Sequence, residues 1–242
     1  MTLCPSKTYF VGMKTLSVTL IVKNEQDNLA RLLPMLTFAD EIIVVDTGST
    51  DNTVNVAKQH TDKIYRFAWC DDFSKARNYA ISKASCSYIM WLDADDIVTP
   101  STQKLLMGWK NSSDSADTYY VKYRMDGDFS FWFWRERILR NCSKCRFKGF
   151  IHEAIVPFGE VRYIECEVLH SPSASHQWRN LAIYQNAITS GMRFSLRDKY
   201  YYARTLVECG KFDEALPILS KFAVNPRAYV SDRADAYMIL AN

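Results

Sequence analysis

Residues 88–96 read YIMWLDADD, an apolar run that ends in three carboxylates within four positions. The run from Tyr88 to Leu92 has the length and composition of a buried β-strand. Asp93, Asp95 and Asp96 would repel one another at the end of that strand unless a cation offset their charge. The segment therefore predicts a buried strand with a cation site at its carboxyl end.

Similar strands recur upstream of this segment, separated by helical stretches. Buried strands are predicted at 16–22, 41–46 and 63–67, and helices at 28–36, 51–60 and 72–83. Strands that are apolar along nearly their whole length and alternate with helices are typical of a parallel sheet covered on both faces. We therefore predict an α/β fold with a mostly parallel, Rossmann-like sheet that carries helices on both faces.

The regularity of the pattern changes after Pro100. A further helix is predicted at 101–109, strands are predicted at 118–123, 131–139 and 161–169, and the chain is helical from His176 onward. The spacing of a tetratricopeptide-like helical hairpin is met by Leu206, Gly210, Phe212, Ala215, Leu216 and Pro226. We therefore predict two domains, an α/β domain at 14–172 and a helical repeat segment at 176–242.

The last helical stretch bears on the length of the natural protein. Ser231 to Leu240 resembles the first helix of a further repeat, so we expect the natural protein to continue beyond Asn242. The alternative is a single terminal hairpin that closes the domain, although one repeat alone cannot bury its own apolar face.

The composition excludes several classes of function. The 242 residues are 48% hydrophobic and carry a formal net charge of +3 without a basic block, which gives no indication of nucleic-acid binding. The longest apolar run, 16–22, is far shorter than the ~20 residues of a membrane-spanning helix, so only peripheral membrane contact stays open. Seven scattered cysteines suit a reducing cytoplasm, and the sequence indicates no oligomeric state.

Polar residues follow three of the predicted strands. Asn24 and Glu25 follow the first strand, Asp46 ends the second, and Asp93 and Asp95 follow the fourth. Ligands of open parallel sheets bind outside the carboxyl ends of the strands, so we expect these side chains to converge. Carboxylate oxygens beside a diphosphate suit Mg²⁺ or Mn²⁺.

Two further observations concern phosphate binding. Arg77 lies in the first turns of the predicted helix at 72–83, where an anion is favourably placed, although a solvated helix face is the alternative. The chain lacks the glycine fingerprint of dinucleotide enzymes and the phosphate-loop motif. Phosphate binding is therefore left to a metal and side chains, which fits sugar-nucleotide chemistry better than hydride transfer or nucleotide hydrolysis.

Four motifs, in this order and spacing, resemble family 2 glycosyltransferases of the GT-A fold over residues 14–170. They are VKNE at 22–25, VDTGSTD at 45–51, FSKARN at 73–78 and WLDADD at 91–96. The helical tail makes the chain similar to the bacterial subgroup that carries tetratricopeptide repeats and includes the S-glycosyltransferases of bacteriocin peptides. The resemblance implies inverting, metal-dependent transfer from a nucleotide-sugar, commonly a UDP-sugar.

The resemblance also assigns roles on the donor side. It implies nucleotide-sugar binding by Asn24, Glu25, Asp46, Arg77 and Asp93. Many relatives carry a second Asp directly after the position of Asp46, where it can read the base. This chain has Thr47 there, which leaves the choice of nucleotide open.

The metal ligands implied by the resemblance are Asp95 and His170. Asp95 lies in the acidic segment, and His170 ends the predicted strand at 161–169, just before the helical tail. The alternative for a lone histidine such as His170 is a structural role.

The acceptor side is implied by the pair His152-Glu153, where many relatives have Glu-Asp. An inverting transferase needs one base to take the proton of the acceptor. By resemblance Glu153 matches the base position, and His152 is the alternative because an imidazole titrates near neutral pH. A purely structural pair also stays open.

The segment 129–137 places aromatic side chains on both faces of a predicted strand. One face is expected in the core, and the other either packs under the helical tail or stacks on a sugar. Arg137 and Arg140 resemble an arginine-rich segment of relatives that helps to neutralise the leaving diphosphate.

We therefore expect a hexose-transferring enzyme whose acceptor is a peptide side chain, a glycan or a lipid-linked sugar. The alternative from a different class is a non-catalytic module that binds nucleotide-sugars or recruits partners through its helical repeats. A sugar nucleotidyltransferase is a third reading, but it usually needs a glycine-rich loop after the first strand, and VKNE at 22–25 has none.

Overall fold

The computed structural model describes residues 13–125, 127, 131–172 and 176–241, and the described chain packs into two compact units. The first unit contains the described residues up to Trp69 and those within Ala76–Phe147 and Ile155–Pro172. The second unit contains Cys70–Lys75, Lys148–Ala154 and the described residues after Pro172. Two short segments from the middle of the chain thus pack with the helical tail. The division into domains at 14–172 and 176–242 remains a prediction.

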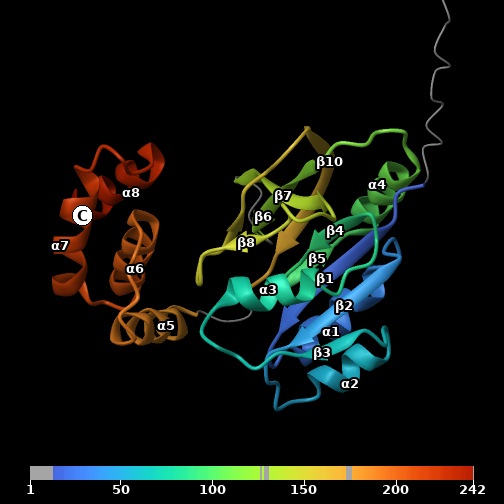
Figure 1. The fold of residues 1–242 in the computed structure, drawn as a ribbon, viewed down its shortest axis with the longest axis horizontal. Helices are drawn as coiled ribbons and strands as arrows, with labels where there is room; N and C mark the ends of the chain where they lie inside the picture. The colour runs from blue at the N-terminus through green and yellow to red at the C-terminus, as the bar shows by residue number, and fades with distance from the viewer. Residues whose placement is uncertain (1–12, 126, 128–130, 173–175, 242) are drawn as a thin grey trace, which may run out of the picture. The chain divides into compact units, whose positions relative to one another are not determined.

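The first unit is built on an eight-stranded mixed sheet with the strand order β3-β2-β1-β4-β7-β6-β10-β5 (Figure 1). Its strands are β1 (Leu16–Val22), β2 (Glu41–Asp46), β3 (Ile64–Arg66), β4 (Tyr88–Trp91), β5 (Asp96–Val98), β6 (Thr118–Met125), β7 (Trp132–Arg140) and β10 (Val161–His170). The pairings among β3, β2, β1 and β4 and between β6 and β10 are parallel, whereas β7 and β5 pair antiparallel with their neighbours. The predicted α/β class with a mostly parallel sheet is confirmed.

Helices cover both faces of this sheet. They are α1 (Gln26–Leu32), which continues into the short 3-10 helix η1 (Leu33–Met35), α2 (Thr53–Lys58), α3 (Phe73–Ile81) and α4 (Pro100–Asn111). Buried residues of α1, α2 and α4 share a core with Val18 and Leu20 of β1, whereas Ala80 of α3 packs against Ile43 and Val45 of β2. Because successive side chains of a strand point to opposite faces, near-continuous apolar strands such as β1 and β2 require helices on both sides.

Three short strands are absent from the predicted pattern. They are β5 and the pair β8 (Phe147–Lys148) and β9 (Ala154–Ile155), which forms a separate two-stranded sheet. Strands of two or three residues are too short to show a hydrophobic period, so the sequence gives no signal for them. The omission of β5 matters because this strand begins with Asp96 and pairs with the end of β10.

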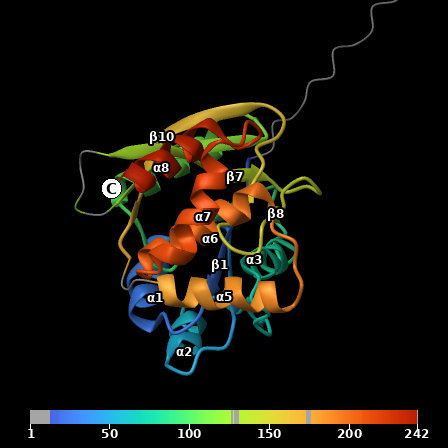
Figure 2. The ribbon, with the colours of Figure 1, turned by 90° about the vertical axis from the view of Figure 1, so that its left-hand side faces the viewer.

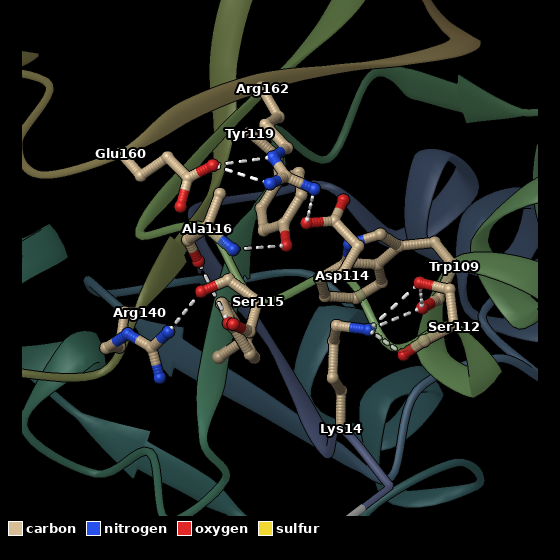
Figure 3. Close-up of polar contacts among 11 residues, drawn as sticks. Lys14, Trp109, Ser112, Asp114, Ser115, Ala116, Tyr119, Arg140, Glu160 and Arg162 are labelled. Atoms are coloured by element: carbon tan, nitrogen blue, oxygen red, sulfur yellow. Dashed lines mark hydrogen bonds and ion pairs between the residues drawn. The ribbon is translucent and has the colours of Figure 1, made fainter. Parts of the chain in front are cut away.

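The amino ends of β1 and β6 are fixed by a polar cluster (Figure 3). The Nζ atom of Lys14 donates to the carbonyl oxygens of Trp109 at 2.9 Å and Ser112 at 2.5 Å, which ties the start of β1 to the end of α4. Arg162 of β10 bridges Asp114 and Glu160 on its two sides. The acidic segment lies at the carboxyl end of β4, so these contacts stabilise the opposite end of the parallel strands.

The helices of the second unit are α5 (Gln177–Thr189), α6 (Leu196–Glu208), α7 (Phe212–Ala223) and α8 (Val230–Ala241). Helices α6 and α7 pack side by side, as do α7 and α8 (Figure 2). Their shared core includes Leu206, Ala215 and Leu219. Ser195 begins α6 with a capping box, in which its hydroxyl accepts from the Asp198 amide and the Asp198 carboxylate accepts from the Ser195 amide. The predicted helical tail after His176 is thus present.

In the described part of the chain, no helix combines the length and the apolar character that crossing a membrane would require. The six cysteines in this part are all free thiols.

Candidate functional site

The loops that follow β1 and β2 are held together by side-chain hydrogen bonds. Asn24 adopts a left-handed backbone conformation, with φ of 57°, and its side-chain oxygen accepts from the Thr50 amide at 2.7 Å. The Asn24 amide in turn donates to the Ser49 hydroxyl at 2.9 Å. Asn tolerates positive φ better than most residues, which explains why it can turn the chain directly after the strand.

Glu25 and Asp46 extend this network. The Glu25 carboxylate accepts from the Asn28 side chain at 2.7 Å, and the Glu25 amide donates to the Thr53 hydroxyl at 2.7 Å. Asp46 is buried and accepts from the Ser49 amide at 2.9 Å. Three of the predicted nucleotide-binding residues, Asn24, Glu25 and Asp46, thus belong to one braced pair of loops at the carboxyl edge of the sheet.

Thr47 has a structural role in this edge. Its side chain is buried, and its hydroxyl donates to the carbonyl oxygen of Val22 at 3.0 Å. The hydroxyl therefore joins the ends of β1 and β2. A carboxylate at this position would have no proton to donate to that carbonyl oxygen.

Arg77 and Asp93 form an ion pair in which the Nη2 and Oδ1 atoms are 2.5 Å apart. The guanidinium lies 5.1 Å from the centre of the Trp91 ring and 5.3 Å from that of the Phe147 ring. Burial alone would raise the pKa of Asp93, but the hydrogen bond from Arg77 and the charges of Arg77, Arg137 and Arg135 together outweigh burial and hold that pKa far below its usual range. The side chain of Asp93 is still a quarter exposed, so the ionised pair borders solvent.

Asp96 is fully buried and links the acidic segment to its surroundings. Its Oδ2 atom accepts from the Asp93 amide at 2.9 Å and lies 3.1 Å from Nη1 of Arg137. Its Oδ1 atom lies 3.2 Å from Nδ1 of His170, the residue opposite Asp96 in the pairing of β5 with β10. Asp96 therefore lies beneath the partly exposed carboxylates and holds the Asp93 amide, Arg137 and His170 in place.

Asp95 and His170 lie beside each other at the exposed side of the segment. Oδ1 of Asp95 is 3.5 Å from Nδ1 of His170, and both side chains keep some exposed surface. Burial, only partly offset by His170, raises the pKa of Asp95, and the charge of Asp93 adds to the rise. Burial would lower the pKa of His170, but the hydrogen bond to Asp96 and the charge of Asp95 raise it overall.

This arrangement fits a divalent cation. Asp93, Asp96 and His170 each offer a ligand atom within 4.8 Å of those of the other two. The predicted ligand Asp95 is outside this set of three, although its Oδ1 atom lies 3.5 Å from Nδ1 of His170. When Nδ1 of His170 donates its proton to ionised Asp96, Nε2 carries the lone pair that can bind a metal. Carboxylates commonly orient metal-binding histidines in this way. Burial and the charge of Asp93 raise the pKa of Asp95, whereas the neighbouring carboxylates raise that of His170, and a cation among these groups would offset the negative charge.

Arg137 is buried rather than available to a diphosphate. Its Nε and Nη2 atoms have no hydrogen-bond partner among the described residues, but its guanidinium lies 3.8 Å from the centre of the Trp91 ring and 4.5 Å from that of Tyr123. Ring faces and Asp96 therefore compensate its charge. Arg140 pairs with Asp117 at 2.7 Å. The expected role of both arginines at the leaving group has no support in these contacts.

His152 and Glu153 belong to the second unit and are part of the segment Lys148–Ala154. The His152 ring stacks on Tyr201 with a centroid distance of 4.2 Å, so one face of the ring is dehydrated although the residue as a whole is exposed. That loss of hydration and the positive charges of Arg197 and Arg204 lower the pKa of His152 to about 4. Glu153 is half-buried.

The aromatic segment that begins at 129 is described from Phe131 onward. Trp132 and Trp134 of β7 share a face with Tyr163 of β10, and Phe133 packs against Tyr123 on the other face. Residues 129 and 130 lie outside the described residues. An open groove of about 610 Å³ beside α4 has Leu105, Trp109 and Tyr163 in its wall and none of the predicted site residues.

Sequence reasoning missed two contacts made by predicted site residues. One is the placement of His170 by Asp96, for which the only sequence signal is the acidic segment itself. The other is the contact of His152 with Tyr201, a position of α6 that the tetratricopeptide-like spacing does not include. Both depend on contacts between residues far apart in the chain.

The chain matches a known protein family. The family model described as Glycosyl transferase family 2 matches residues 17–179. The glycosyltransferase SunS encoded by the SPbeta prophage of Bacillus subtilis is 25% identical, over 93% of this chain and 58% of SunS. A TPR repeat-containing protein of Synechococcus elongatus is 42% identical over 36% of this chain and 22% of that protein. The chain thus spans less than two thirds of the length of these curated relatives.

Two solved structures show the same fold. Staphylococcus aureus TarS 1-349 in complex with UDP-GlcNAc is 15% identical, with a TM-score of 0.55 over 94% of this chain and 70% of that chain. Glucosyl-3-phosphoglycerate synthase from Mycobacterium tuberculosis, in complex with Mn²⁺, UDP and phosphoglyceric acid, is 15% identical, with a TM-score of 0.52 over 75% of this chain and 80% of that chain.

Proposed function

The chain belongs to glycosyl transferase family 2, and from that premise we propose that it transfers a hexose from a UDP-sugar to an acceptor, with a divalent cation and with inversion at the anomeric carbon. The observation that carries the proposal is the convergence of Asp93, Asp95, Asp96 and His170 with Arg77 at the carboxyl edge of the sheet. The edge combines anionic oxygen ligands, an imidazole and a guanidinium, which together suit a metal-bound diphosphate.

The donor roles follow from these positions. Asp95 and His170 would hold Mn²⁺ or Mg²⁺, while Asp96 orients His170 from the buried side. When bound, the cation supplies Lewis-acid stabilisation of the leaving diphosphate. Asn24, Glu25, Asp46, Asp93 and Arg77 would bind the nucleotide. The UDP-GlcNAc and UDP complexes of the two structural neighbours support a uridine nucleotide. Thr47 lies where many relatives carry an Asp that can read the base, so the contact to the base stays open.

The proton of the acceptor goes to Glu153 in this proposal. The acceptor oxygen or sulfur forms a bond to the anomeric carbon while the bond from that carbon to the diphosphate oxygen breaks, and the carboxylate takes the acceptor proton. Glu153 is proposed because it matches the base position of similar enzymes, and the stacking of the His152 ring on Tyr201 leaves one face of that imidazole covered. A thiol acceptor would need less help from the base because its pKa is lower than that of a hydroxyl.

The acceptor stays open among a peptide side chain, a glycan and a lipid-linked sugar. The helical hairpin of α6 and α7 supports the proposal of tetratricopeptide-like repeats at 176–242 behind a transferase domain at 14–172. Such repeats would favour a peptide. The described cysteines are free thiols, which supports the proposal that the enzyme acts in a reducing cytoplasm.

The test is a screen of UDP-sugars for Mn²⁺-dependent release of UDP, because donor hydrolysis requires no acceptor. We expect turnover with at least one UDP-hexose, its loss in Asp95→Ala, and a donor-binding but inactive Glu153→Gln. Asp62→Ala, which removes an exposed carboxylate elsewhere in the first unit, is the matched control. Full turnover in Asp95→Ala would reject the metal role, and full turnover in Glu153→Gln would reject the base.

A further inference from the structure

We propose that Tyr201 and Arg197 of the helical tail are positioning residues that hold the loop 148–154 in the conformation which presents Glu153. The inference rests on the proposed function, in which Glu153 is the base. It gives the helical tail a role in the transfer reaction itself, beyond the recruitment of a partner.

The loop has a backbone conformation that needs support. His152 has a φ of 49°, in the left-handed region that non-glycine residues adopt at a cost. Gly149, with a φ of 96°, provides the other turn at no such cost. Its backbone also runs close to that of Glu153, since a Cβ on Gly149 would lie 3.6 Å from the Glu153 Cα. Left alone, the His152 backbone would relax, and the adjacent Glu153 would move with it.

The helical tail contacts His152 at two places. The Tyr201 ring stacks on the imidazole with a centroid distance of 4.2 Å and an interplanar angle of 22°. Arg197 donates from Nη2 to the His152 carbonyl oxygen at 3.3 Å, and its guanidinium lies 4.7 Å from the centre of the Tyr201 ring. Both the side chain and the peptide group that leads to Glu153 are therefore restrained by one face of α6.

A second anchor fixes the loop before His152. The Phe150 ring packs edge-on against Tyr184 at 5.4 Å and beside Phe194 at 5.8 Å. The Phe150 carbonyl oxygen accepts from the Phe73 amide at 2.8 Å. With Phe150 and His152 both held, the backbone that leads to Glu153 is restrained by residues of the same unit.

The chemistry explains why such restraint matters. A general base must lie within hydrogen-bond distance of the acceptor proton, and a displacement of about 1 Å can cost on the order of 100-fold in rate. Restraint by Tyr201 and Arg197 should therefore affect the transfer step and leave donor binding unchanged. The ring, rather than the hydroxyl, of Tyr201 makes the stacking contact, so Phe should substitute for Tyr.

The experiment compares Tyr201→Ala, Tyr201→Phe and Arg197→Gln with Tyr229→Ala, which removes an exposed tyrosine of the same unit. Two quantities are measured in the whole chain: Mn²⁺-dependent UDP release from UDP-glucose and UDP-N-acetylglucosamine, and amide hydrogen exchange of residues 151–154. For Tyr201→Ala we expect kcat to fall roughly 10-fold or more, affinity for Mn²⁺ and UDP to stay within about 2-fold, and exchange at 151–154 to accelerate. Tyr201→Phe should retain the parent values, and the exposed Arg197→Gln should change exchange in the same direction with little risk to the fold.

Different results would overturn the positioning role of Tyr201 and Arg197 and the assignment of Glu153 as the base. Parent-like exchange at 151–154 in both Tyr201→Ala and Arg197→Gln would overturn the positioning inference even if no turnover were found with either sugar. So would parent-like kcat in Tyr201→Ala when Glu153→Gln is inactive. Full turnover in Glu153→Gln would instead overturn the assignment of the base on which the inference rests.

Discussion

The Nδ1 atom of His170 lies 3.2 Å from Oδ1 of Asp96, and the two residues are partners in the antiparallel pairing of β10 with β5. The same carboxylate contacts Arg137 from its other oxygen, at 3.1 Å, without exposed surface on either side chain. Asp96 therefore links a buried arginine to the histidine that we propose as a metal ligand. Removal of its charge should lower both the stability of the fold and the affinity for the metal.

Asp96→Asn should destabilise the fold because it leaves the charge of Arg137 buried without its anion. Breaking a buried pair of this kind costs roughly 3–5 kcal/mol, and loss of the partner that orients a metal-binding histidine lowers metal affinity about 10–100-fold. Urea unfolding and Mn²⁺ titration of the variant measure the two effects.

The matched control for this prediction is Asp95→Asn. Asp95 is partly exposed and has a raised pKa through burial and the charge of Asp93, so neutralising it should leave the metal-free stability unchanged or increase it. A free energy of unfolding for Asp96→Asn within about 1 kcal/mol of the parent would contradict the structural role of Asp96.

Glu41 should make the stability of the fold depend on acidic pH. Its side chain is almost fully buried, yet hydrogen bonds from Lys63, Ser17 and Ser85 overcome the effect of burial and lower its pKa from 4.5 to about 2. A depressed folded-state pKa means that the contribution is complete above about 4.5 and is lost as the pH falls through about 2.

Glu41→Gln should therefore lower the free energy of unfolding at pH 7, by up to about 3 kcal/mol at ~1.4 kcal/mol for each pKa unit. The difference from the parent should shrink toward zero near pH 2. Unfolding by urea at several pH values tests this, with the exposed Glu208→Gln as control. A difference that does not vary with pH would contradict the depressed pKa.

His152 should stay neutral through the range in which an ordinary histidine titrates. Its pKa is lowered from 6.5 to about 4, so the unfolded chain binds more protons between those values. Stability from this residue is then complete above about 6.5 and declines as the pH falls toward 4. The NMR titration of the His152 ring should have its midpoint near 4, and Tyr201→Ala should shift it upward. A midpoint near 6.5 in the parent would contradict an environment in which burial and the charges of Arg197 and Arg204 lower the pKa of His152.

Gly159→Ala should destabilise the first unit more than Gly191→Ala destabilises the second. Both glycines have positive φ, of 65° and 78°, so each substitution costs about 1–2 kcal/mol from backbone strain. At Gly159 the new Cβ would also overlap the Asp117 carboxylate, which pairs with Arg140 and accepts from the Glu160 amide. Gly191 has open space at that position. We expect a further ~1–3 kcal/mol at Gly159 from the lost contacts, measured by urea unfolding, and equal losses would show that Asp117 moves aside freely.

The local pattern of the chain was sufficient for the main strands and for the residues at their ends. The strands predicted at 16–22 and 41–46 coincide with β1 and β2, because continuous β-branched and apolar runs of that length have few other stable conformations. The acidic segment could be located for the same reason, since three carboxylates in four residues interrupt an apolar run and burying them without partners is costly.

Strand order and register could not be predicted from the sequence. Asp96 and His170 are 74 residues apart, and they meet only because β5, too short to be recognised, pairs with the end of β10. Tyr201 and His152 likewise meet through the packing of a loop on α6, which no local period encodes. The sequence by itself determined which residues carry charge at the ends of the parallel strands. Tertiary structure alone decided which carboxylate orients the histidine and which helix holds the loop of Glu153, because these contacts depend on long-range packing rather than on neighbours in the chain.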